Sequence, residues 1–373
     1  MRATFTSRHS LCFVILLFAC VSIAHATDPG AEASRLLAAA LAEDRGPGAM
    51  AAVVRDGEVI WSDAVGWADL EAKVALTPDS LLRTGSVAKP LTAALVARLV
   101  AAGKLDIDAP VQKRVVELPH EAITARHLGT HTSGIRHYDF TNYDEANNTR
   151  FHTSLDEALA TFLDDPLLTA PGQAFHYSSF GYNLLGVVAA RAAEGSYAGA
   201  LATWLTEPLG LDGIRIDHPL DIVPRRGRFY TIKPDGTVIN TIWRDSSDYY
   251  PSGGLLATAE DLARFTWACF RGPLLDGAPR QLFTTPGAMA DGDDSPYSFG
   301  WQVERDDDGA IIAYQHGGET NGAAAIVRFD PATGIAVAGL ANYNFWYDGE
   351  PAFYATVSER IPALFAADHA AKE

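Results

Sequence analysis

Cysteine is scarce in this sequence of 373 residues, which contains three: Cys12, Cys20 and Cys269. So few cysteines exclude a small scaffold held together by disulfide bonds, and stability must come from a hydrophobic core. Hydrophobic residues make up 48% of the chain and charged residues 20%, a balance that excludes a disordered or collagen-like protein. The chain is long enough for one large domain or two ordinary ones.

Basic residues are also few, with 29 Lys and Arg against 46 Asp and Glu, which gives a formal charge of −17. Nucleic-acid binding depends on clustered Lys and Arg, so we expect no nucleic-acid partner. The sequence shows no internal repeat and no low-complexity tract. No linker separates two parts of the chain, and we therefore predict a single domain.

The N-terminus carries an apolar run of 14 residues, from Leu11 to Ala24. It is shorter than the roughly 20 residues that span a bilayer, and a small-x-small triplet ending at Ala26 follows it. We predict a signal peptide over residues 1–26 and a periplasmic or secreted mature chain with no membrane span. An uncleaved anchor and a lipoprotein cut before Cys20 are the alternatives.

Removal of residues 1–26 changes the totals. Arg2 and Arg8 are lost and no acidic residue is, so the formal charge goes from −17 to −19. Cys269 then remains as the only thiol of the mature chain, residues 27–373. It lies in an apolar run over residues 265–270, and we expect an inert buried thiol rather than a nucleophile.

Secondary-structure patterns divide the mature chain into two ends and a middle. Near the start, a helix over residues 31–43 precedes two strand-like runs, residues 50–55 and 58–66, joined by the typical hairpin turn Asp56-Gly57. Strand patterns return over residues 298–304, 310–315, 323–329 and 335–341, before a last helix over residues 351–365. The middle is mainly helical, with a helix that contains Leu91 and others over residues 154–164, 180–194 and 258–270.

Strands at both ends with helices between them predict one discontinuous α+β domain. Its sheet would join the two ends of the chain, in an α/β part over about residues 27–85 and 290–366. A mainly helical subdomain over about residues 86–289 would be inserted between these segments.

Ser86-Val87-Ala88-Lys89 opens the predicted helix that contains Leu91. A spacing of three residues places Ser86 and Lys89 on one helix face, about one turn apart. The helix start favours developing negative charge, and Lys89 is near enough to lower the pKa of the hydroxyl or to take its proton. The alternative is structural, because serine commonly caps helices and lysine is usually solvated.

Two further segments are candidates to act with this pair. Tyr177-Ser178-Ser179 precedes the helix over residues 180–194, which places a phenol at a helix entrance, as a proton shuttle or as a buried packing residue. His316-Gly317-Gly318-Glu319 follows the strand over residues 310–315, where the two glycines let backbone N–H groups approach a ligand. A histidine there can bond a carboxylate or carbonyl; an ordinary glycine-rich strand end is the alternative.

The sequence resembles the serine β-lactamase and penicillin-binding-protein superfamily, which includes the class C β-lactamases. The resemblance rests on three motifs in the family's order: Ser86-x-x-Lys89, the Tyr177 triplet and the strand-end His316-Gly317-Gly318. Residues 130–135 (THTSGI) and 252–262 (SGGLLATAEDL) are similar to runs of this family. Residues 134–138 (GIRHY) and 177–182 (YSSFGY) resemble the branch that holds mitochondrial serine β-lactamase-like proteins and their exported bacterial relatives. The resemblance covers residues 49–343.

The resemblance implies a β-lactamase/transpeptidase-like fold with an antiparallel sheet, and a serine hydrolase that needs no metal or other cofactor. Ser86 would form an acyl-enzyme, Lys89 and Tyr177 would share general-base work, and Tyr177 would later protonate the leaving group. The backbone N–H groups of Ser86 and Glu319 would form the oxyanion hole. A small-molecule or peptide substrate would be bound by Ser179, His316, Gly318 and Glu319.

Two residues depart from the family's β-lactamases, which usually have Asn where Ser179 stands and Lys where His316 stands. Lysine is cationic at neutral pH, whereas an unperturbed histidine titrates at about 6.5. Both changes argue for peptide or ester substrates, and we expect protonation of His316 to gate activity at roughly pH 6–7. A true β-lactamase, a DD-carboxypeptidase and a penicillin-binding sensor without turnover are the alternatives.

Metal catalysis is the competing enzyme class. Three histidines cluster in the sequence: His127, His131 and His137. The first two have the spacing of a zinc-binding helix, but the acidic residue that follows the first histidine in such helices is missing. Asp306-Asp307-Asp308-Gly309 is similar to part of a calcium loop, yet no Glu follows at the required distance, and a solvated hairpin turn is expected.

Substrate specificity would depend on two loops, residues 138–153 and 224–250. Their aromatic residues would line a groove or form part of the core: Tyr138, Phe140, Tyr143, Phe229, Tyr230, Trp243, Tyr249 and Tyr250.

Overall fold

The computed structural model describes residues 28–272, 277–290, 292, 294–346, 349 and 351–370. The predicted signal peptide, and with it Cys12 and Cys20, lies outside the described residues. Within them, no helix combines the length and apolar composition needed to cross a membrane. Cys269 is buried in α9 (Ala259–Phe270), and burial raises the pKa of its thiol well above the usual value.

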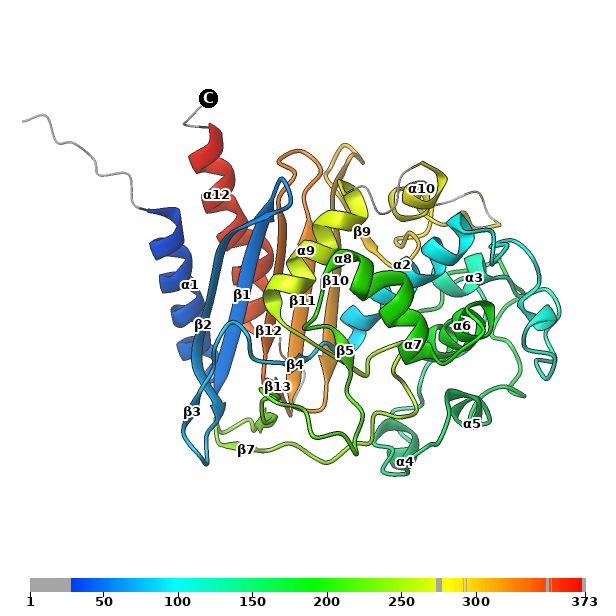
Figure 1. Cartoon of the computed structure of the whole chain (residues 1–373), viewed down its shortest axis with the longest axis horizontal. Coiled ribbons are helices and arrows are strands. Elements are labelled where there is room, and N and C mark those ends of the chain that lie inside the picture. The colour runs from blue at the N-terminus through cyan, green and yellow to red at the C-terminus, as the bar shows by residue number, and fades with distance from the viewer. Residues whose placement is uncertain are drawn as a thin grey trace, which may run out of the picture.

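A seven-stranded antiparallel sheet, made from both ends of the chain, forms the centre of the fold (Figure 1). The strand order is β3-β2-β1-β12-β11-β10-β9. The strands are β1 (Gly48–Arg55), β2 (Glu58–Asp69), β3 (Val74–Ala75), β9 (Gln302–Arg305), β10 (Ile311–Thr320), β11 (Ala323–Phe329) and β12 (Ala336–Ala341). β1 pairs with β12 from Ala49 opposite Ala341 to Val54 opposite Ala336, which confirms an α+β fold whose sheet joins both chain ends.

The predicted hairpin between β1 and β2 is confirmed. Asp56 and Gly57 have φ values of +52° and +85°, the conformation that a two-residue type I′ turn requires at both positions. Along β1, alternate residues enter two separate core clusters, as Met50 and Val53 illustrate. A strand that is apolar on both faces must be covered on both faces.

Helices provide this cover (Figure 1). The terminal helices α1 (Pro29–Asp44), α11 (Ala352–Ala355) and α12 (Ile361–Ala370) pack on one face of the sheet, and α9 packs on the other. The wider turn η5 (Thr356–Arg360) separates α11 from α12. The predicted last helix is present without a break in helical structure, and it ends at Ala370 rather than at residue 365.

The middle of the chain is mainly helical and lies beside the sheet (Figure 1). Its helical elements are η1 (Gly85–Val87), α2 (Ala88–Ala101), η2 (Val111–Lys113), α3 (Ala125–Gly129), α4 (Tyr143–Ala146), α5 (Leu155–Leu159), α6 (Ser179–Ala192), α7 (Tyr197–Leu201), η3 (Ala202–Thr206), α8 (Glu207–Leu209) and α10 (Ala278–Thr284). Two small sheets accompany them, with the orders β4-β8-β5 and β13-β6-β7. Their strands are β4 (Leu82–Arg83), β5 (Arg215–Ile216), β6 (Tyr230–Ile232), β7 (Val238–Asn240), β8 (Leu255–Ala257) and β13 (Tyr343–Phe345).

Two strand boundaries differ from the sequence prediction. β9 begins at Gln302 rather than at residue 298, because a tight turn, in which Ser298 N–H donates to Trp301 O at 2.8 Å, precedes it. β10 continues to Thr320, because its pairing with β11 extends to Thr320 opposite Ala323. The segment from His316 to Glu319 therefore lies inside a strand and does not follow one.

Candidate active site

Ser86 lies in the short 3₁₀ turn η1, which leads directly into α2. Lys89 therefore belongs to the first turn of α2. Its Nζ donates hydrogen bonds to Ser86 Oγ at 3.0 Å and to the carbonyl oxygen of Ser252 at 2.9 Å. The two residues of the Ser-x-x-Lys motif are thus in direct contact.

The amine of Lys89 is enclosed by protein. Lys89 is fully buried, and its Nζ lies 4.9 Å from the ring centroid of Tyr177 and 5.9 Å from that of Tyr182. Burial holds the pKa of Lys89 well below its usual value, because a charged amine would lose its hydration there. A low pKa favours the neutral amine, which can accept a proton from the Ser86 hydroxyl.

Two histidines hold the segment that carries Tyr177. Ser178 N–H donates to His131 Nδ1 at 3.0 Å, and Ser179 N–H donates to His137 Nδ1 at 3.2 Å. Both rings also contact Tyr177, with centroid distances of 4.4 Å for His131 and 5.3 Å for His137. Because each Nδ1 accepts a hydrogen bond, each neutral ring carries its proton on Nε2.

The hydroxyl of Ser178 fixes the Tyr177 segment to the start of helix α6. Its Oγ accepts the N–H of Gly181 at 2.9 Å, which caps α6, and donates to Arg136 O at 2.7 Å. A side-chain oxygen at this position satisfies a backbone N–H that the first helical turn leaves without a partner. Tyr177, the residue before the cap, is therefore presented from a fixed helix start.

The phenol of Tyr177 interacts with the side chain of Ser86, which acts to lower the pKa of the phenol. Burial has the larger effect and raises this pKa above its usual value. A phenol with a raised pKa stays protonated at neutral pH and is suited to donating a proton. Of the two bases expected from the sequence, Lys89 is therefore in the better state to act first.

The free edge of β10 lies directly against Ser86. β9 pairs only with the first half of β10, and the rest of that edge faces η1. A Cβ on Gly318 would lie 2.2 Å from Thr84 O and 3.0 Å from Ser86 N, and a Cβ on Gly85 would lie 2.7 Å from Glu319 N. Glycine at both positions thus brings the backbone N–H groups of Ser86 and Glu319 close together, as an oxyanion hole requires.

His316 lies behind this edge and does not line the pocket. Its Nδ1–H donates to Gly317 O at 2.6 Å, so Nε2 accepts from the Tyr297 hydroxyl at 2.7 Å. Burial lowers the pKa of His316 to about 3. The titration expected at pH 6–7 therefore does not occur, because a buried imidazole without an acidic partner stays neutral.

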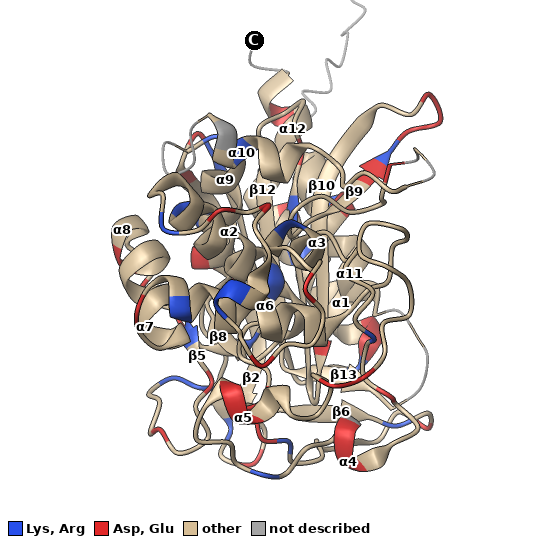
Figure 2. Cartoon of the chain, turned by 90° about the vertical axis from the view of Figure 1, so that its right-hand side faces the viewer, with Lys and Arg blue, Asp and Glu red and all other residues tan. Residues whose placement is uncertain are grey.

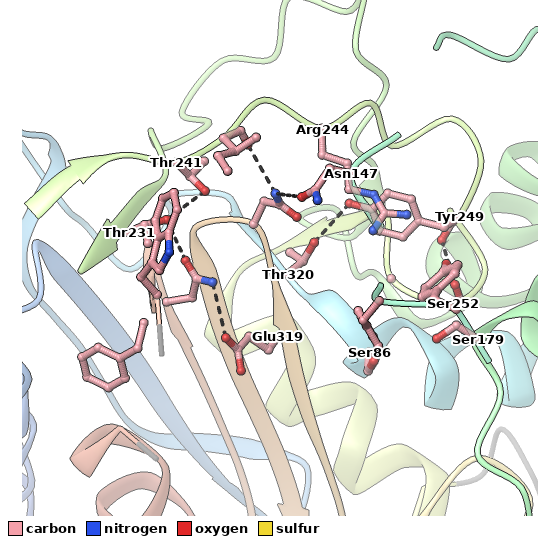
Figure 3. A pocket seen from close by; sticks show the side chains of 18 of the residues that line it. Ser86, Asn147, Ser179, Thr231, Thr241, Arg244, Tyr249, Ser252, Glu319 and Thr320 are labelled. Atoms are coloured by element: carbon pink, nitrogen blue, oxygen red, sulfur yellow. Dashed lines mark hydrogen bonds between the residues drawn. The ribbon is translucent and has the colours of Figure 1, made fainter. Parts of the chain in front are cut away.

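A pocket of about 510 Å³ opens over Ser86 (Figure 3). Ser86, Ser179 and Ser252 lie on one side of the view and Glu319 on the other. Asn344 Nδ2 donates to Glu319 Oε1 at 3.4 Å. Of the substrate-binding residues expected from the sequence, Ser179 and Glu319 line this pocket, whereas His316 and Gly318 do not.

The aromatic residues of the two predicted specificity loops divide between several places. Three line the pocket: Tyr138, Phe140 and Tyr249. The others line a neighbouring cavity of about 590 Å³ (Phe229 and Trp243), are buried (Tyr230 and Tyr250) or are exposed (Tyr143). Sequence reasoning missed the aromatic pair Phe345 and Trp346, which also lines the pocket and comes from the end of β13.

The side chains considered as metal ligands have other roles. His127 Nδ1 accepts a backbone N–H in the cap of α3, while His131 and His137 hold the Tyr177 segment. Residues 306–308 form the exposed, acidic tip of the β9–β10 hairpin (Figure 2), where Asp306 Oδ1 accepts the N–H of Asp308. Over the described ranges of the chain, no group of three His, Cys, Asp or Glu side chains is placed to hold a metal ion.

Comparison with known proteins identifies related sequences and structures. A family model described as Beta-lactamase matches residues 33–357. The human mitochondrial serine beta-lactamase-like protein LACTB is 29% identical over 304 residues, which cover 63% of this chain and 55% of that protein. Esterase EstB from Burkholderia gladioli is 37% identical over 188 residues, 46% of this chain and 47% of that protein. The chain thus spans about half the length of these curated relatives.

A solved structure shows the same fold. The octameric penicillin-binding protein homologue from Pyrococcus abyssi superposes with a TM-score of 0.74, over 91% of this chain and 77% of that chain. The two sequences are 23% identical, so this likeness concerns the fold alone.

Proposed function

The chain belongs to the Beta-lactamase family, whose members include serine hydrolases, and we propose that it is a serine hydrolase that forms an acyl-enzyme through Ser86. The observation that carries the proposal is the 3.0 Å hydrogen bond between Lys89 Nζ and Ser86 Oγ, with Lys89 fully buried. An amine whose pKa is lowered by burial can accept the hydroxyl proton as Ser86 attacks a carbonyl carbon.

In the proposed reaction, Ser86 Oγ forms a bond to the carbonyl carbon of the substrate and its proton passes to Lys89. The N–H groups of Ser86 and Glu319 stabilise the oxyanion, each such donor contributing about 3 kcal/mol in the transition state. Tyr177 donates its proton to the leaving oxygen or nitrogen, and the proton on Lys89 restores the phenol. Water then attacks the acyl-enzyme and gives its proton to neutral Lys89; the bond between the acyl carbon and Ser86 Oγ breaks, and the proton passes from Lys89 to Ser86 as the acid is released.

Peptides and esters are the proposed substrates. Ser179 offers a short hydroxyl where the family's β-lactamases have an amide, and buried, neutral His316 supplies no positive charge to hold a carboxylate. Both features support substrates whose binding does not depend on a carboxylate beside β10. The similarity to an esterase supports the same choice.

A substrate panel tests this proposal. The wild type and Ser86→Ala are compared on nitrophenyl esters, on dipeptides of both configurations and on a cephalosporin, with folding checked by circular dichroism. We expect turnover of an ester or peptide in the wild type and a loss of at least about 10³-fold in Ser86→Ala. Ester turnover that survives in Ser86→Ala contradicts the proposal, and stable acylation without turnover indicates a sensor instead.

We also propose that the protein is exported, on the sequence of residues 1–26. After expression in a Gram-negative host, N-terminal sequencing of the periplasmic protein should begin at Thr27. A sequence that begins at Met1 supports the uncleaved anchor, and one that begins at a lipid-modified Cys20 supports the lipoprotein.

A further inference from the structure

Two exposed aromatic side chains stand at the mouth of the Ser86 pocket. Phe140 is 69% exposed and Trp346 is 54% exposed, and both line the pocket. Phe140 comes from the loop before α4, whereas Trp346 follows β13, some 200 residues later. Large apolar surface that stays in contact with water beside a pocket is typical of a binding site.

Phe140 is connected to the catalytic side of the pocket. Its ring makes an edge contact with the ring of His137, with centroids 5.4 Å apart and an interplanar angle of 85°. His137 in turn accepts the N–H of Ser179 and contacts the ring of Tyr177. The position of Phe140 is therefore fixed relative to the residues around Ser86.

Trp346 is connected to the sheet side. Its backbone N–H donates to Ile232 O at 2.9 Å, which extends the parallel pairing of β13 with β6 by one residue. Thr231, the neighbour of Ile232 in β6, lines the same pocket. Two separate parts of the fold thus each supply one largely exposed ring to a single opening.

We propose that Phe140 and Trp346 form an apolar subsite that binds the aliphatic or aromatic part of the substrate's acyl group. This inference rests on the proposed function and names the substrate class of the same site. The acyl group is the part of a substrate that stays bound to Ser86 through both steps, whereas the leaving group departs after the first. A methylene buried against such rings strengthens binding by up to about fourfold, so the subsite favours long acyl chains over acetyl.

The chain offers a matched control. Trp243 is 58% exposed, similar to Trp346, but it lines the neighbouring cavity and not the Ser86 pocket. If the loss of any exposed aromatic ring changed the acyl-chain preference, truncation of Phe140, Trp346 or Trp243 would change it equally. An effect on acyl-chain preference should be confined to Phe140 and Trp346.

The experiment measures kcat/KM for nitrophenyl acetate, butyrate and hexanoate. We expect the wild type to prefer hexanoate to acetate by at least about tenfold, since four methylenes are added. The double variant Phe140→Ala/Trp346→Ala should reduce this ratio by at least about fivefold, and Trp243→Ala should leave it unchanged. Phe140→Leu and Trp346→Phe keep apolar contact and should retain most of the preference.

Labelling of Ser86 by methyl and hexyl fluorophosphonates makes a similar comparison without turnover; we expect the wild type to prefer hexyl and the double variant to lose most of this preference. A wild-type ratio near one, or an equal ratio in the double variant, overturns the subsite. Either result leaves the proposed function intact as long as acetate turnover is lost in Ser86→Ala. Fluorophosphonate labelling that prefers hexyl, with no ester or peptide turnover, instead supports the subsite and contradicts the proposed function.

Discussion

The floor and the mouth of the Ser86 pocket are built in opposite ways. The floor is the buried layer beneath the residues that line the pocket; there, Lys89 and His316 are 0% and 1% exposed, and hydrogen bonds at 2.6 to 3.0 Å hold their nitrogen atoms. At the mouth, Phe140 and Trp346 are largely exposed. Burial lowers the pKa of both floor residues and so sets their charge, whereas the two rings at the mouth keep most of their surface in contact with water. Under the proposed function and subsite, the catalytic residue Lys89 is buried, whereas the residues that select the substrate, Phe140 and Trp346, are exposed.

Removal of the buried amine should have the largest effect. Lys89→Met keeps most of the side-chain volume but provides no base, and general-base catalysis contributes about 10²–10⁴-fold. We therefore expect kcat/KM for an ester substrate to fall by about 10³-fold. Lys104→Met, which removes a partly exposed lysine paired with Glu194 at 3.7 Å, is the control and should keep its activity. Equal activities of wild type and Lys89→Met would show that the floor does not supply the base.

A methyl group on the edge of β10 should have the next largest effect. In Gly318→Ala the new Cβ would meet Thr84 O at 2.2 Å, so β10 must move away from η1 and the two oxyanion donors separate. Loss of one donor corresponds to about 10²–10³-fold in kcat. Gly317→Ala is the matched control, because a Cβ there meets nothing within 4 Å. Similar kcat values for the two variants would contradict the proposed oxyanion hole.

His316 should affect stability in acid and not the activity profile. Its pKa is about 3 in the folded protein and about 6.5 when unfolded, so between these values the unfolded chain binds more protons. The contribution of His316 to the free energy of unfolding is complete above the unfolded pKa of about 6.5, and it is lost as the pH falls toward the folded pKa of about 3. From pH 7.5 to 4.5 this one residue should cost on the order of 3 kcal/mol of unfolding free energy.

Comparison with His316→Gln isolates this contribution, because glutamine does not titrate. The difference in unfolding free energy between wild type and variant, measured in urea, should shrink by about 2–3 kcal/mol over the same pH range. The pH–rate profiles of both proteins should have the same shape between pH 5.5 and 8. A kinetic step near pH 6.5 that is present in the wild type and absent in His316→Gln would restore the gating role.

Truncation at the mouth should have the smallest effect on stability. Phe140→Ala and Trp346→Ala should each change the unfolding free energy by less than about 0.5 kcal/mol, as exposed positions usually do. Phe265→Ala, which empties a fully buried site in the core, should cost about 3–5 kcal/mol. A cost above 2 kcal/mol at either mouth position, by urea denaturation, would mean that the ring is structural and would remove the contrast with the floor.

The sequence predicted what depends on local pattern. Alternation, turn residues and caps located β1, β2, β11, α6 and α9 to within a few residues, because such signals act over a few neighbours. They failed at β10, where a glycine pair was interpreted as a strand end. Gly318 is instead required within the strand by its contact with Thr84, a residue more than 200 positions away.

The environment of the site depended on such distant contacts. The charge state of His316 follows from its burial beside Tyr297 and Lys89, and no sequence pattern around His316 predicts that burial. The spacing of His131 from His127 suggested a metal ligand, yet His131 and His137 each accept a backbone N–H from a residue more than 40 positions away. Trp346 gave no signal at all, since it reaches the pocket through the pairing of β13 with β6.

The most direct measurement is the rate at which a fluorophosphonate labels Ser86, followed by intact mass and by mass spectrometry of the labelled peptide. At pH 7.5 we expect one adduct, on Ser86, in the wild type, and labelling at least about 10²-fold slower in Lys89→Met because the hydroxyl has lost its base. An adduct on another serine of the pocket, such as Ser179 or Ser252, or equal rates in the two proteins, would contradict the assignment of Ser86 as a nucleophile activated by buried Lys89.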